Sequence, residues 1–152
     1  MLPEDLLMMF QQNQGELNKF NVPILTPSVV SNIYSKTSTY AFPETDQNNR
    51  INMLNDPLFI KLEKSTFKNL HQLNDDDFCS AVWAYSRNHE EEQGILNTNI
   101  SDRVGDAVVE ELSFRQYNLS EENLGLVLRG LAKLPVMRDH EKEWGEVINF
   151  LG

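Results

Sequence analysis

Residues 73–87 read LNDDDFCSAVWAYSR and contain the clearest helix start in the chain. A leucine stands first, a polar residue that can cap a helix follows it, and an apolar residue returns five positions after the leucine. The same arrangement occurs in LTPSVV at 25–30 and in LSEENL at 119–124. One local pattern therefore appears three times in the chain.

Each of these stretches predicts the first turn of a helix. We expect Thr26, Asn74 and Ser120 to be N-cap residues, because a short polar side chain there accepts a hydrogen bond from an early backbone N–H. The leucine before each cap would form a hydrophobic staple with the apolar residue that stands four positions after the cap. Pro27 falls at the first helical position, where proline is best tolerated, and the acids at 75–77 suit the positive end of the helix dipole.

The spacing of the caps indicates an internal repeat. Asn74 follows Thr26 by 48 residues, and Ser120 follows Asn74 by 46 residues, so each interval can hold two helices and a turn. Apolar residues at helical spacing predict a further helix before each of the later caps, over 56–67 and 101–112. Because a single helix pair cannot bury its apolar faces alone, we predict an all-α fold in which helix-turn-helix repeats stack into a short α-solenoid.

Apolar stripes follow the two later caps at the same offset. The first consists of Phe78, Ala81, Val82 and Tyr85, and the second of Leu124, Val127, Leu128 and Leu131. Both have the i, i+3, i+4, i+7 spacing of a helix face that packs against a neighbour. We divide this single domain into a degenerate first unit at 1–35, a connector at 36–52, repeats at 53–93 and 94–134, and a closing helix at 135–152.

Composition limits the possible functions. The chain has 152 residues, 40% of them hydrophobic, and no run of about eighteen apolar residues, so we expect no membrane insertion. A net charge of -10 argues against nonspecific nucleic-acid binding as the main activity. The single cysteine, Cys79, indicates a reducing intracellular compartment. The start MLPED is acidic where an import presequence would be basic, so we expect a chain that is cytosolic, already processed, or imported by an internal signal.

Residues 73–87 resemble the second helix of the heptatricopeptide and octotricopeptide repeats, which favour a capped leucine start and a Trp-Ala-aromatic-or-Leu-Ala-Lys ending. Residues 119–134 are similar, although Arg129-Gly130 stand where the earlier segment has Trp83-Ala84. The resemblance covers about residues 54–134. It implies a mitochondrial or other organellar location and a role in binding RNA or in joining an organellar ribonucleoprotein.

No residue pattern predicts catalysis, a cofactor or a metal site. The segments HEEE at 89–92 and HEKE at 140–143 both lack the second histidine at i+4 that a zinc-binding helix requires. The acids at 75–77 lack the glycine and the closing glutamate of a calcium loop, so we interpret them as helix-capping residues. We interpret Cys79 as a quiet, partly buried thiol, because no base lies near it in the sequence.

Five residues are candidate contacts with RNA or a protein partner: Lys61, Lys64, Lys68, Trp83 and Arg87. The lysines share one helix face and Arg87 ends the next helix, which gives either a phosphate-contacting patch or a solvated face. Trp83 lies off the centre of its apolar stripe and either packs between repeats or anchors a partner. We interpret Gly125 and Gly130 as positions that allow close helix packing.

These patterns predict a non-enzymatic adaptor or structural subunit that docks onto protein neighbours through shape and charge. The first hypothesis places it in a large organellar assembly such as a mitochondrial ribosome. A close variant is an accessory subunit of a respiratory or ATP-synthase complex. The alternative is direct RNA binding through the three lysines and Arg87, which predicts a salt-sensitive affinity.

Overall fold

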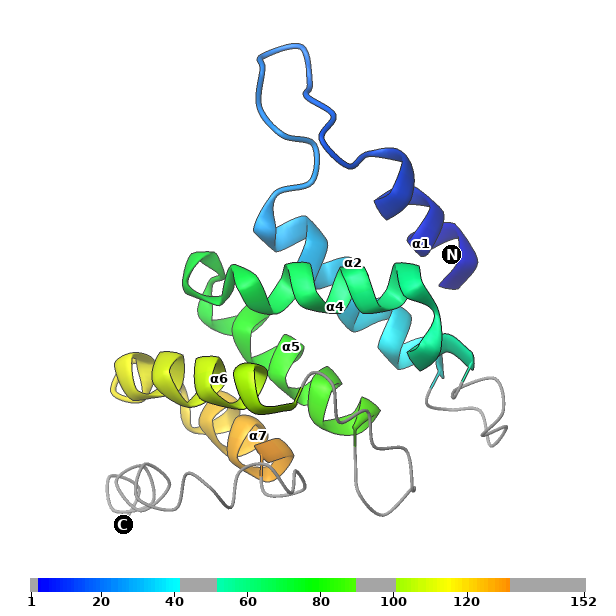
Figure 1. Cartoon of the computed structure of the whole chain (residues 1–152). Helices are drawn as coiled ribbons and strands as arrows, with labels where there is room; N and C mark the ends of the chain where they lie inside the picture. The colour runs from blue at the N-terminus through cyan, green and yellow to red at the C-terminus, as the bar shows by residue number, and fades with distance from the viewer. Residues whose placement is uncertain (1–2, 42–51, 90–100, 132–152) are drawn as a thin grey trace.

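The structure is a computed structural model, and it describes residues 3–41, 52–89 and 101–131. These residues form helices and no strand, which confirms the expected all-α class (Figure 1). The elements are α1 (Pro3–Gln12), α2 (Pro27–Ala41), α4 (Pro57–Lys68), the short 3₁₀ helix η1 (Leu70–Gln72), α5 (Asp75–Asn88), α6 (Ser101–Arg115) and α7 (Glu121–Leu131), with a single helical turn at 52–55. Among the described helices, none has the length and apolar character needed to cross a bilayer.

All three expected N-caps are confirmed. The side-chain oxygen of Asn74 accepts a hydrogen bond from the Asp77 N–H at 2.8 Å. Thr26 accepts one from Val29 N–H at 3.2 Å, and Ser120 accepts one from the N–H three residues later at 3.1 Å. The same local chemistry therefore starts α2, α5 and α7, because each cap satisfies an N–H that has no partner within its helix.

The helices lie in two rows. In one row α5 lies between α2 and α7, and in the other α4 follows α1 and contacts α6. Figure 1 shows α4 and α6 in front of α5 and α7. The apolar stripes of α5 and α7 face into the space between the rows, and all their members are buried except Leu128, which is partly buried.

Helix α2 is longer than the sequence pattern indicated. We expected it to end near Ser35 and the connector to begin at Lys36, but α2 continues to Ala41. The side chains of Thr37 and Ser38 are buried, and their hydroxyls donate to the carbonyl oxygens four residues earlier, at 2.7 and 2.8 Å. Those bonds let hydroxyl residues face the core without an unsatisfied polar group, so a polar sequence remains helical. The rest of the connector, the expected closing helix at 135–152 and the second histidine segment lie outside the described residues.

A polar cluster lies within the core where α2, α4 and α5 meet. Glu63 is fully buried, and its carboxyl group accepts a hydrogen bond from the Tyr34 hydroxyl at 2.6 Å. His89 Nε2 lies 3.0 and 3.1 Å from the two oxygens of the same carboxyl group. The amide of Asn88 donates to the Tyr34 hydroxyl and to Ser38 Oγ. Burial, with a further contribution from the adjacent Glu63, raises the pKa of Tyr34 well above its ordinary value.

The three aspartates that begin α5 each bind a different neighbouring helix. Asp75 pairs with Arg115 of α6 at 3.0 Å, Asp76 accepts from Asn123 of α7 at 2.8 Å, and Asp77 accepts from Ser28 of α2 at 2.8 Å. We interpreted these acids as capping residues, and their side chains have this additional role between helices. A group of three or more potential metal ligands is not found anywhere in the described residues.

Candidate functional site

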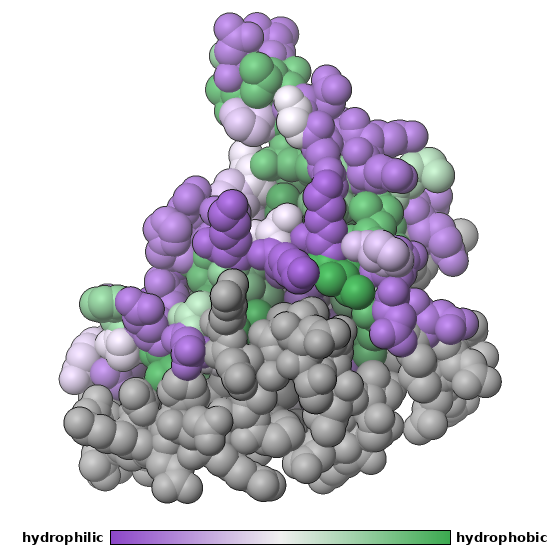
Figure 2. Space-filling view, in the orientation of Figure 1, coloured by the Kyte–Doolittle hydropathy of each residue, from purple (hydrophilic) through white to green (hydrophobic). Residues whose placement is uncertain are grey.

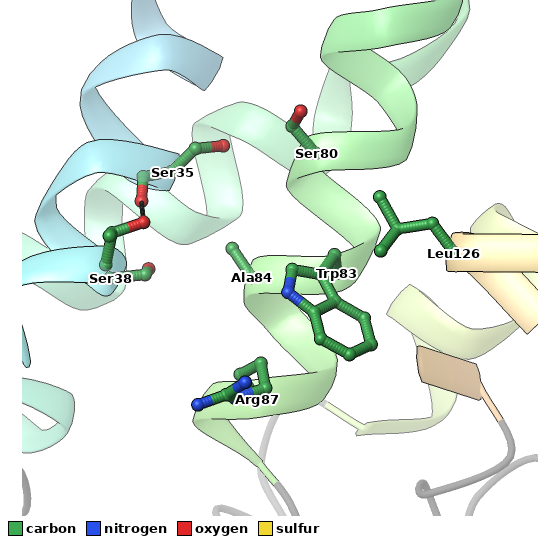
Figure 3. Close-up of a pocket in the computed structure, with 8 residues that line it drawn as sticks. Ser35, Ser38, Ser80, Trp83, Ala84, Arg87 and Leu126 are labelled. Atoms are coloured by element: carbon green, nitrogen blue, oxygen red, sulfur yellow. Dashed lines mark hydrogen bonds between the residues drawn. The ribbon is translucent and has the colours of Figure 1, made fainter. Parts of the chain in front are cut away.

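A groove of about 450 Å³ opens between α2, α5 and α7 (Figure 3). It is lined by Ser35, Ser38 and Thr39 from α2, by Ser80, Trp83, Ala84 and Arg87 from α5, and by Leu126 from α7. Because the lining side chains come from three helices, the groove exists only when all three pack together. Its volume is in the range of cavities that hold a small ligand or a few side chains of another protein.

The two long walls of the groove differ in chemistry. The α2 wall presents hydroxyl groups, and the opposite wall is formed by the indole of Trp83 and the side chain of Leu126. In Figure 3, Ser80 and Arg87 lie toward opposite ends of the groove, with Ala84 and Trp83 between them. An extended or helical segment can therefore place an apolar side against one wall and polar groups against the other.

Trp83 and Arg87 are one helical turn apart on α5 and lie against each other. The guanidinium carbon of Arg87 is 5.6 Å from the centroid of the Trp83 ring, which is the range of a cation–π contact. Among the described residues that line the groove, Arg87 alone is charged. A carboxylate on the ligand therefore suits this end of the groove, because it would pair with the positive charge next to an apolar wall.

The structure separates the five predicted contact residues into two groups. Trp83 and Arg87 come together in the groove, whereas Lys61, Lys64 and Lys68 lie on the exposed face of α4 and are not part of the lining. Lys61 Nζ donates to the side chain of Gln14 at 2.6 Å. Arg87 therefore belongs to the groove, and the three lysines form a separate exposed face on α4.

Sequence reasoning did not identify the other wall of the groove. In the α2 wall, Ser38 and Thr39 lie in a part of α2 that looked like the start of a connector, and Ser35 lies where that helix was expected to end. On the Trp83 wall, Leu126 was outside the predicted stripe of α7. A usable signal was present in α2, because hydroxyl residues recur at i, i+3 and i+4 there. That spacing places them on one face of a helix.

Close packing of α7 against α5 holds Trp83 in place. A Cβ atom added at Gly130 would lie 2.7 Å from Ser86 Oγ and 3.2 Å from Cε3 of Trp83. The interpretation of Gly130 as a close-packing position is therefore confirmed. The interpretation of Gly125 is wrong for the described part of the chain, because an added Cβ there meets none of its atoms within 4 Å.

We expect Gly130→Ala and Gly125→Ala to change stability in opposite directions. The first variant should lose about 1 to 3 kcal/mol of unfolding free energy and displace the indole, because the added methyl group overlaps Ser86 and Trp83. The second should gain up to about 1 kcal/mol, because alanine is the better helix former and nothing obstructs it. Urea unfolding measures both changes, and tryptophan fluorescence in a Trp144→Phe background reports on Trp83. Equal effects of the two variants would contradict this account of the groove wall.

Two reactive side chains outside the groove, those of Cys79 and His89, lie inside the core. Cys79 is buried, and burial, with a further contribution from Asp75, raises the pKa of its thiol to about 12. The thiol therefore stays protonated near neutral pH and is a poor nucleophile there. The ring of His89 is committed to Glu63 inside the core.

Comparison with known proteins finds no family model that matches the chain, no similar curated protein and no similar solved structure. What the groove does must therefore be inferred from its own chemistry.

Proposed function

We propose that the chain is a non-enzymatic helical-repeat adaptor that holds a segment of another protein in the groove between α2, α5 and α7. The repeat interpretation is supported by three equivalent N-caps at similar spacing and by the two rows of helices. In this proposal the rows are a short α-solenoid, and α2, α5 and α7 are the second helices of its successive units.

One observation supports this function above the others: the groove contains both Trp83 and Arg87, the two predicted contact residues that lie on α5. Tryptophan and arginine are enriched among the residues that dominate binding energy at protein interfaces. An apolar side chain of the partner would contact Trp83 and Leu126, and a carboxylate would pair with Arg87. On the α2 wall, the hydroxyl group of Ser35 would bind a backbone group of the partner, because those of Ser38 and Thr39 already donate to carbonyl oxygens of α2.

The resemblance to organellar repeat proteins extends the proposal to a mitochondrial ribonucleoprotein as the assembly. An accessory role in a respiratory or ATP-synthase complex is the close variant. Direct RNA binding is the alternative, and it would involve the exposed lysines of α4 instead of the groove. These three hypotheses differ in whether protein contacts or RNA contacts hold the chain in its assembly. Sedimentation with and without RNase distinguishes them.

We expect Trp83→Ala to release the chain from its assembly. The tagged protein is sedimented from cell and organelle lysates, with and without RNase, and the proteins in its fraction are identified by mass spectrometry. Loss of a binding hot spot costs about 2 kcal/mol or more, so the variant should move to the light fractions. Phe114→Ala is the matched control, because Phe114 is an exposed aromatic residue outside the groove.

Because Trp83 also contacts α7, a second variant keeps the test independent of folding. Arg87→Glu reverses the charge that Arg87 brings to the groove lining and should also release the chain. Co-sedimentation with ribosomal proteins that collapses after RNase supports the ribonucleoprotein, and an RNase-resistant membrane complex supports the bioenergetic variant. If both groove variants still co-sediment and a Lys61→Glu/Lys64→Glu/Lys68→Glu variant does not, the groove proposal is wrong and RNA binding replaces it.

A further inference from the structure

Residues 15–24 form an ordered hairpin between α1 and α2, which we call the 15–24 hairpin. The backbone N–H of Asn18 donates to Val22 O at 2.9 Å, and Ile24 N–H donates to Glu16 O at 3.0 Å. At the turn, Asn21 N–H donates to Asn18 O, and Asn21 has a φ of 61°. That left-handed conformation favours glycine or asparagine, so the residue type fits the turn.

Asn18 fixes the tip of the hairpin from within. Its side-chain oxygen accepts hydrogen bonds from the backbone N–H of Phe20 at 2.8 Å and from that of Val22 at 3.2 Å. Together with the backbone bonds, these contacts determine the path of the chain between Asn18 and Val22. The side chain of Phe20 is therefore presented from a defined backbone and not from a freely moving loop.

The hairpin exposes apolar side chains. Seven large apolar residues are exposed in the described part of the chain, and four of them are on the hairpin: Leu17, Phe20, Val22 and Ile24. Phe20 is 72% exposed, and the least exposed of the four, Ile24, is 40% exposed. Figure 1 shows the hairpin projecting beyond the helices, and in Figure 2 apolar side chains appear among polar ones on this projection.

These exposed apolar side chains of the hairpin take no part in the core that the described residues form. Single exposed apolar residues are common on protein surfaces, but a cluster on a rigid projection is typical of an interaction site. A convex, pre-ordered tip fits a concave apolar pocket, because little conformational freedom is lost when it inserts. The side chain best placed to enter such a pocket is that of Phe20.

The negative charge of the chain favours one class of partner for the hairpin over others. The chain carries a net charge of -10, and Glu16 of the hairpin is exposed. Lys19, the one basic residue of the hairpin, has its ammonium 5.1 Å from the centroid of the Phe20 ring. An anionic lipid surface or a nucleic acid would meet repulsion from this charge, whereas a basic protein surface would be attracted.

We propose that the 15–24 hairpin inserts Phe20 into an apolar pocket on a protein partner whose surrounding surface is basic. This site is separate from the groove, because no hairpin residue lines the groove. The chain would thus hold two proteins, or two parts of one protein, at different places. The inference adds a second contact to the proposed adaptor, and its test does not depend on whether the groove binds a partner.

The test places a photo-crosslinking amino acid, p-benzoylphenylalanine, at position 20 in the full chain expressed in cells. The matched control places it at position 114, because Phe114 is 71% exposed and lies on α6. We expect a protein adduct from position 20 that is not formed from position 114, and the protein in it should be basic. Asn18→Ala should lower the yield of this adduct, and Asn18→Asp should restore it, because aspartate keeps the accepting oxygen.

The crosslinked protein is then purified, and its affinity for unmodified variants is measured. Phe20→Ser should weaken binding about thirtyfold, the loss expected for a hot-spot side chain, and Phe114→Ser should leave the affinity unchanged. Both positions are exposed, so neither change should prevent folding. An affinity that Phe20→Ser leaves unchanged overturns the proposal.

Three other results would also overturn it: adducts of equal yield from both positions, an adduct only with a second copy of this chain, or binding to phosphatidylcholine–cardiolipin vesicles that Phe20→Ser abolishes. The Arg87→Glu variant separates the two proposals. If it lowers co-sedimentation but leaves the adduct from position 20 intact, the hairpin and the groove have different partners.

Discussion

Glu63→Ala should reduce the free energy of unfolding by about 3 to 5 kcal/mol, the usual cost of removing one partner from a buried, hydrogen-bonded pair. The variant leaves the Tyr34 hydroxyl and His89 Nε2 without their acceptor inside the core. It also leaves a cavity between α2, α4 and α5, because the Glu63 side chain is fully buried. Urea unfolding followed by far-UV circular dichroism measures the loss.

Glu63→Gln is the matched control. Glutamine has nearly the same volume and keeps a carbonyl oxygen for the Tyr34 hydroxyl, so we expect a loss of only about 1 to 2 kcal/mol. Destabilisation by the alanine variant of less than about 1 kcal/mol would show that the cluster contributes little to folding.

Arg115→Ala should reduce the free energy of unfolding by about 2 to 4 kcal/mol. The guanidinium group donates to the carbonyl oxygens of Leu70 and Leu73 at 3.0 and 2.6 Å and to Glu111 at 2.7 Å. Its carbon also lies 4.9 Å from the centroid of the Phe78 ring. The bond to Asp75 adds less, because that carboxylate is 44% exposed and is screened by solvent.

Arg115→Lys should recover little of this loss, since an ammonium group cannot reproduce the planar set of donors. Arg129→Ala is the comparison at an exposed site, where the arginine donates to one carbonyl oxygen at 3.3 Å. We expect it to change stability by no more than about 0.5 kcal/mol. If the alanine variants at 115 and 129 behave alike, Arg115 does not join α6 to η1 and α5 as described. Thermal and urea unfolding of the purified variants provide the measurement.

Helix starts were predictable from the sequence because capping chemistry is local. Thr26, Asn74 and Ser120 each bond to an N–H three residues away, so the residues that determine the cap lie within one turn. The proximity of Trp83 and Arg87 was predictable for the same reason, since residues four apart share a helix face. The groove itself was not predictable, because its α2 wall lies 44 to 52 residues from Trp83 and Arg87 in the chain.

The buried polar cluster depends on contacts that no local pattern specifies. Glu63 and His89 are 26 residues apart, and Tyr34 is 29 residues from Glu63. A partial signal existed, because Glu63 stands within the apolar stripe of α4 beside Leu62 and Phe67. An acid on a buried helix face requires a partner, but the sequence does not say which residue supplies it. The 15–24 hairpin was likewise not predicted within the first unit, although asparagine at position 21 is a turn signal.

The central position of α5 makes the unfolding of the molecule cooperative. The first three residues of α5 contact α6, α7 and α2, and eight of its fourteen residues are buried. A linear stack in which each unit contacts only the next can fray from its ends, one unit at a time. Because α5 lies between α2 and α7, it is not at an end of the row and cannot open without loosening both neighbours. The amide protons of α5 should therefore be the slowest to exchange with solvent, and their exchange should require cooperative, global opening.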